Sequence, residues 1–290
     1  MSAIIEKITD FIRNILEGWI LSNLHGMFSE VNTQVGNIAG TVAITPSDWE
    51  PSIFRMVRTI SDNVIVPIAG VVIAYVLIYE LISMVVDKNN ANDYDVGLFV
   101  KYLMKACIAV LLLSKTADIT MAFFDLGGEV VTRVGGLIPE STSLDVERTL
   151  DTLFEERLAY MDLGQLFGLG LETMIVGLTI KIISALIMVV VFSRMIEIYI
   201  YISISPIPFA TLTNRDWGNV GTNYIRGLMA LAFQGFFIMI CVAIYAALIG
   251  HLVIADDLHT SLWEIVGYTI ALCFSLFKTS SVSKSIFGAH

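Results

Sequence analysis

Charged residues are scarce in this sequence. They make up 15% of its 290 residues, hydrophobic residues make up 56%, and the mean hydropathy is +0.77. A soluble domain of ordinary composition carries about 25% charged residues. Lipid therefore has to cover much of the apolar surface, and a large separate soluble domain has no room in the chain. The net charge of −10 also argues against a general nucleic-acid-binding surface, which relies on clustered Lys and Arg.

Cysteine and the motifs of catalysis are equally sparse. Cys107, Cys241 and Cys273 all lie in apolar stretches, where a thiol behaves as a small buried hydrophobe, so we expect no disulfide and no metal site. The sequence holds no His-Glu-x-x-His, no Gly-x-Ser-x-Gly and no phosphate-binding loop. We therefore expect a protein that is not an enzyme and that binds no cofactor, structural phospholipids aside.

An amphipathic helix is predicted over residues 3–28, because large apolar side chains recur there every three or four residues with charges on the other face. Two interpretations stay open. The helix lies in the membrane interface with Trp19 near the headgroups, or it packs on a partner. Residues 32–51, with several Gly, Thr and Ser and two prolines, are expected to form a loop. We take residues 1–60 as an external or interfacial region and residues 61–290 as a transmembrane domain.

Apolar runs of roughly 20 residues predict about five membrane-spanning helices. The runs cover residues 64–86, 102–124, 163–212, 224–252 and 261–277. The third run exceeds what a hydrocarbon layer of roughly 30 Å requires, so its helix is tilted, broken or projects beyond the membrane. Residues 126–165 are predicted to form an acidic external loop. The expected fold class is an all-α, polytopic membrane protein with an N-terminal amphipathic helix.

The distribution of Lys and Arg predicts the orientation, because positively charged loops are retained in the cytoplasm. These residues gather near the span ends in segments 87–105 and 204–223 and in the C-terminal tail, whereas segments 126–165 and 251–261 carry few. With five spans, the N-terminus lies outside and the C-terminus lies in the cytoplasm.

Ionisable residues inside spans are costly and are candidates for function. The third run carries Glu172, Lys181, Arg194 and Glu197. Glu172 and Lys181 lie more than two helical turns apart, so each has to meet another helix, another subunit or water. Arg194 and Glu197 can pair at i and i+3, or reach the interface with their charged ends. Gln234 is expected to bond across helices, and such bonding is favoured over a transporter site because no internal repeat is visible.

The segment between the third and fourth spans carries a recognisable pattern. It contains the turn Pro206-Ile-Pro208, then Asn-Arg-Asp-Trp-Gly ending at Gly218, and Ala-Phe-Gln-Gly ending at Gly235. These features resemble the TrbL-like, VirB-type polytopic inner-membrane subunit of conjugative type IV secretion systems, in the branch found in mobile elements of Gram-positive bacteria. The similarity is best in the third and fourth spans.

The resemblance implies a subunit of the bacterial plasma membrane that helps translocate single-stranded DNA with its bound relaxase, a substrate that it contacts only transiently. It also implies other secretion subunits as partners, including cytoplasmic ATPases that supply the energy. We expect the 204–223 turn to face those ATPases. Pro206 and Pro208 end the preceding helix there. The candidate contacts that follow are Arg215, Asp216 and Trp217, and an anchor in the membrane interface is the alternative.

Size predicts a homo-oligomer, since five helices of one copy cannot enclose a passage for a protein-linked strand. The alternative function is a small-solute or ion channel or transporter, which would need Glu172 and Lys181 for flux. A third possibility is a structural anchor of an injection machine or an immunity protein, which would need no intramembrane charge.

Overall fold

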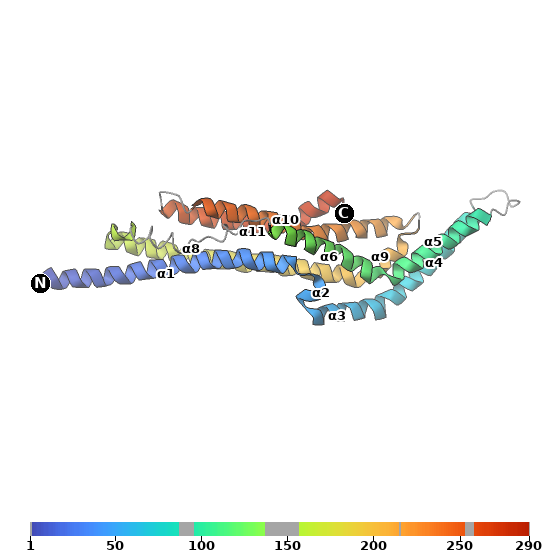
Figure 1. Ribbon diagram of the computed structural model, residues 1–290, viewed down its shortest axis with the longest axis horizontal. Coiled ribbons are helices and arrows are strands. Elements are labelled where there is room, and N and C mark those ends of the chain that lie inside the picture. The colour runs from blue at the N-terminus through green and yellow to red at the C-terminus, as the bar shows by residue number, and fades with distance from the viewer. Residues whose placement is uncertain (1, 87–95, 137–156, 215, 253–257, 290) are drawn as a thin grey trace. The chain divides into compact units, whose positions relative to one another are not determined.

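The computed structural model is helical, and its described part, residues 2–86, 96–136, 157–214, 216–252 and 258–289, contains no strand (Figure 1). Its elements are α1 (Ser2–Ala43), α2 (Pro46–Trp49), α3 (Pro51–Ile60), the π-helical turn η1 (Ser61–Ile65), α4 (Val66–Val86), α5 (Val96–Ser114), α6 (Thr116–Gly135), α8 (Leu163–Ile204), α9 (Pro206–Thr211), α10 (Gly218–Leu252) and α11 (Leu258–Phe287). The all-α fold class predicted from the sequence is confirmed.

Four helical stretches in the described part are long and apolar enough to cross a membrane. They are Pro51–Val86, Leu163–Ile204, Gly218–Ile249 and His259–Phe287. The pair α5 and α6 adds a fifth if it is counted as one bent span. The protein is therefore a polytopic membrane protein, as the apolar runs predicted.

The helices form two compact units. Unit 1 contains Met1–Val42, Thr132–Val191 and Ile238–Lys278, and unit 2 contains Ala43–Val131, Phe192–Phe237 and Thr279–His290. Each unit has a buried apolar core, because the helices that build it turn hydrophobic side chains toward one another. Helices α8, α10 and α11 contribute residues to both units.

Unit 1 is built from the buried faces of α1, α8, α10 and α11. Its largest fully buried side chains include Ile20, Leu166, Leu169, Ile180, Ile187 and Ile238. Trp19 of α1 packs directly on α8, where a Cβ on Gly170 would lie 2.5 Å from the indole ring. Asn23 adds a hydrogen bond of 3.1 Å to the hydroxyl of Thr173. The second half of α1 is thus part of the core of this unit.

The predicted loop over residues 32–51 is wrong for most of its length, because α1 continues without a break to Ala43. Val31, Ile38 and Val42 are buried at helical spacing, so packing of this face outweighs the weak helix propensity of the neighbouring Gly, Ser and Thr residues.

The second predicted span, over residues 102–124, is also not one straight helix. It is divided between α5 and α6, which meet at an angle of 63°. The hydroxyl of Ser114 donates to the carbonyl of Leu111, and that of Thr116 donates to the carbonyls of Leu112 and Leu113. Such side-chain bonds to the preceding turn compete with the regular helical pattern and accompany bends.

The acidic loop predicted over residues 126–165 is shorter than expected at both ends. Helix α6 extends to Gly135 and α8 begins at Leu163, while residues 137–156 lie outside the described part. Gly127 is compatible with a helix because α6 and α10 approach closely there, and a Cβ on it would lie 2.5 Å from the carbonyl oxygen of Ala232. The glycine serves close helix packing rather than a turn.

Unit 2 is organised around an aromatic core. Phe124, Tyr199, Phe209 and Tyr224 are buried together with Met195, Ile198 and Leu228. Helices α4 and α5 form an antiparallel hairpin (Figure 1), in which Ile73 packs near Ala109 and Lys105 forms an ion pair with Glu80.

Candidate functional site

The connection between α8 and α10 is a packed structure in unit 2. Helix α8 ends at Ile204, and Pro206 and Pro208, both buried, begin the short helix α9. Proline suits the first turn of a helix, where its missing amide hydrogen is not needed. Helix α9 packs on the α4–α5 hairpin, with Ala210 in a buried cluster that includes Ala69.

The residues before α10 are held by Asn214. Its side-chain oxygen accepts hydrogen bonds of 2.9 Å from the backbone amides of Asp216 and Trp217. The Trp217 ring lies 5.5 Å from the ring of Tyr75 of α4, and the Asp216 carboxylate accepts a hydrogen bond from Tyr79. Trp217 remains 47% exposed, so it is both fixed and accessible. Arg215, the third candidate of this turn, lies outside the described residues.

The pairing that the spacing allows between Arg194 and Glu197 is not found among the described residues. Arg194 is 6% exposed. Within the described part of the chain its one hydrogen bond, 3.5 Å long, goes to the carbonyl of Leu231, and its Nε has no partner. Glu197 instead pairs with Lys284 of α11 at 2.8 Å. Spacing along one helix showed that the first pair was possible, but the packing of α11 on α8 supplies Glu197 with a different partner.

Helix α11 also supplies the partner of Glu172. The carboxylate of Glu172 lies 2.5 Å from Nδ1 of His259, within unit 1. Both acids of α8 therefore contact α11, and the two pairs have the same sequence separation of 87 residues. Sequence reasoning missed both pairs, although this equal separation was visible in the positions of the four residues.

Two other candidates differ in their surroundings. Gln234 is buried and donates to the hydroxyl of Thr279 of α11 at 3.3 Å, while its carbonyl oxygen has no partner among the described residues. Lys181 is exposed on α8, and within the described chain no carboxylate lies at ion-pair distance from it. The structure thus brings the predicted site residues to several places rather than to one.

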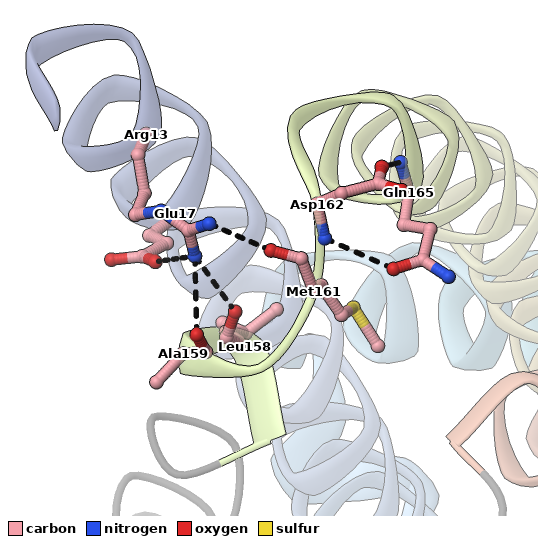
Figure 2. Close-up of polar contacts among 7 residues, drawn as sticks. All are labelled: Arg13, Glu17, Leu158, Ala159, Met161, Asp162 and Gln165. Carbon is pink, nitrogen blue, oxygen red and sulfur yellow. Dashed lines mark hydrogen bonds and ion pairs between the residues drawn. The ribbon is translucent and has the colours of Figure 1, made fainter. Parts of the chain in front are cut away.

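Arg13 forms a polar contact that the sequence did not reveal. Figure 2 shows its guanidinium reaching from α1 toward the carbonyls of the segment before α8. It donates to the carbonyl oxygens of Leu158, Ala159 and Met161 at 3.4, 3.3 and 2.8 Å. A planar guanidinium with five N–H donors suits such a set of acceptors.

The start of α8 is capped beside this contact (Figure 2). The Asp162 side chain accepts from the amide of Gln165 at 2.8 Å, and the Gln165 side chain accepts from the amide of Asp162 at 3.0 Å. This reciprocal capping satisfies two of the free amides at a helix start. Arg13 and the cap together fix where α8 begins relative to α1 in unit 1.

Replacing Arg13 with lysine is expected to loosen the first half of α1. Lysine keeps the charge but cannot reach several carbonyls at once, so we expect a loss of about 2 kcal/mol and roughly 30-fold faster hydrogen exchange of the amides around residue 13. Hydrogen exchange followed by mass spectrometry measures this. Arg55→Lys is the control, since among the described residues Arg55 bonds only the carbonyl of Pro51 in its own helix. Equal rates in both variants would contradict the role of Arg13.

The comparisons with known proteins give one match. Residues 31–206 match a family described as "TrbL/VirB6 plasmid conjugal transfer like protein". No curated protein and no solved structure is similar to the chain at the level required for a match. The matched region extends from α1 to the start of α9 and includes α8 with its four charged candidates.

Proposed function

The chain belongs to the TrbL/VirB6 plasmid conjugal transfer-like family, and from this membership we propose that it is the membrane channel or scaffold subunit that helps move single-stranded DNA with bound relaxase out of the donor cell. The family makes it a component of a conjugal transfer system, working in a complex with other subunits. The observation that carries the proposal is the family match over residues 31–206. The membrane-spanning helices support it, because they suit a path through a membrane.

Recovery of DNA with the protein tests this role. Formaldehyde treatment of mating donor cells is expected to link the tagged chain to the transferred strand, which is then purified with it and quantified by PCR. A plasmid without a transfer origin in the same cells is the control. Deletion of the gene should abolish transfer and the intact gene should restore it. Normal transfer after deletion, or equal recovery of both plasmids, would reject the proposal.

We further propose that the turn before α10 contacts the cytoplasmic ATPases of the system. The bonds from Asn214 and the packing on Tyr75 hold Trp217 in one place while leaving it about half exposed, as a contact surface requires. Aromatic side chains of this kind often dominate the energy of protein interfaces.

Trp217→Ala is expected to abolish transfer without lowering the level of the protein in the membrane. The ATPases should also be lost from the purified complex, because the variant removes a contact rather than a helix. Mating frequency, immunoblots and co-purification measure the three effects. Trp263→Ala is the control, since Trp263 of α11 is 55% exposed but lies far from this turn in the sequence. Normal transfer by the Trp217 variant would exclude the ATPase contact.

A further inference from the structure

Lys181 occupies a costly position. It lies near the middle of the 42-residue helix α8, on an exposed and otherwise apolar surface. None of the ion pairs among the described residues joins Lys181 to a carboxylate. A charge at this depth of a membrane-spanning helix normally faces the interior of a bundle or pairs with another group. Within one copy, Lys181 does neither.

Glu264 of α11 is in a similar position. It is partly exposed within the apolar stretch His259–Phe287, and none of the ion pairs found in the described chain includes it. Lys181 and Glu264 thus place a cation and a carboxylate, each without an ion-pair partner among the described residues, within apolar stretches of unit 1. Their charges are complementary.

The two groups cannot meet within one copy. Glu172 marks the side of α8 that faces α11, because it contacts His259. Lys181 follows nine residues later, which is about two and a half turns, so it projects from the opposite side of α8. Glu264 follows His259 by five residues and is rotated by about 140° from the side of α11 that faces α8. The charges thus lie on opposite sides of the α8–α11 pair.

The two groups nevertheless lie at nearly the same level along the helices. Helices α8, α10 and α11 follow one another as membrane-spanning candidates, so α8 and α11 run in the same direction, and the Glu172–His259 pair sets their register within unit 1. By that register Glu264 is level with Gly177, one turn or about 6 Å from Lys181. Helical side chains lean toward the helix N-terminus, and the lysine side chain, which is longer than that of glutamate, extends further in that direction and reduces the difference in level.

We propose that Lys181 of one copy pairs with Glu264 of the next copy, in a head-to-tail contact between two molecules of this chain. Copies in one membrane are related by rotation about the membrane normal, so a given residue lies at the same depth in every copy. Lys181 of one copy can therefore meet Glu264 of the next, because the two lie at nearly the same depth. The space beside Gly177 supports a close neighbour, since a Cβ there would meet no atom within 4 Å. A contact between different surfaces of the same chain builds a ring when the rotation closes. Such a ring would be the oligomer that the proposed function requires. The experiments below test the contact itself, because they measure only whether copies associate.

Cross-linking between copies tests the contact directly. In a background with Cys107, Cys241 and Cys273 changed to serine, one tagged copy carries Lys181→Cys and a differently tagged copy carries Glu264→Cys. A short bis-maleimide is expected to give a dimer with both tags. Glu172→Cys replaces Lys181→Cys in the control, because Glu172 projects from the other side of α8, and little product should form. No doubly tagged product, or as much in the control, would overturn the proposal.

Charge reversal provides the second test. The mass of the wild-type particle in nanodiscs should be that of several copies. Lys181→Glu or Glu264→Lys alone should reduce it toward one copy, and the two changes together should restore it. A wild-type mass in the single variants would show that Lys181 faces lipid or water instead. If a single variant fails to accumulate, accumulation of the double variant supports the ion pair. If the double variant also fails to accumulate, the ion pair is refuted. DNA transfer is not measured, so a negative result leaves the proposed function standing.

Discussion

Gly127→Ala is expected to destabilise the protein by about 3 kcal/mol, toward the upper end of the cost of overpacking. The new Cβ would lie 2.5 Å from the carbonyl oxygen of Ala232 and 3.0 Å from its carbonyl carbon. These are backbone atoms, which cannot rotate away as a side chain can, so α6 and α10 would have to move apart. The movement would open the core around Phe124 and Ala232.

Thermal unfolding in detergent measures this effect as a lower Tm. Gly36→Ala is the matched control, because a Cβ on Gly36 of α1 meets no atom within 4 Å. Alanine there should stabilise the helix by up to about 1 kcal/mol, since it removes the high backbone entropy of glycine in a helix. Similar Tm values for the two variants would show that α6 does not approach α10 as closely as described.

Arg194→Met is expected to raise stability while abolishing DNA transfer. Arg194 is 6% exposed, and the long contact to Leu231 is its one hydrogen bond among the described residues, so its charge is poorly compensated. Replacing buried charges with apolar side chains of similar volume often stabilises a protein by about 1–4 kcal/mol. A poorly compensated charge in a protein that is otherwise well packed is typical of a functional position.

Arg226→Met is the control for this experiment. Arg226 lies on α10 and is exposed, so we expect a change in unfolding free energy within about 0.5 kcal/mol. Tm in detergent and mating frequency are measured for both variants. If Arg194→Met lowers the Tm, the guanidinium has better partners than those described. If it transfers DNA normally, the charge serves no step of transfer.

The membrane-spanning helices were predictable because the hydrocarbon layer imposes a long apolar run that the sequence displays directly. The span over residues 64–86 corresponds closely to α4, and the runs 224–252 and 261–277 lie within α10 and α11. Their ends were less predictable. Helices α10 and α11 extend beyond the apolar runs because polar residues continue a helix in contact with other helices as readily as in water.

Glycine-rich segments were the least predictable part of the fold. Gly127 falls in the loop predicted over residues 126–165, yet it lies within α6 where α10 approaches. A glycine in a turn and a glycine in a close helix contact are the same letter in a sequence. Only the position of the partner helix distinguishes them, and that position is a tertiary property.

The candidate residues were identified by type but not by partner. For Glu197 the sequence left open a pair with Arg194 or a reach to the interface, and the structure pairs it with Lys284 instead. The i and i+3 rule describes contacts along one helix, whereas Lys284 comes from another helix. Arg13 was missed altogether, because its acceptors are backbone carbonyls, which carry no signal in the sequence.

The pairing of both α8 acids with α11 has a consequence for the order of synthesis. Glu80 meets Lys105 in the next helix of the chain, so that pair can form as soon as α5 has been made. Glu172 and Glu197 instead wait for His259 and Lys284, each of which follows 87 residues later in the chain. A nascent or truncated chain without α11 would hold two unpartnered carboxylates in its longest apolar helix. Helix α11 therefore completes the polar contacts of α8, and these contacts form only after α11 has been made.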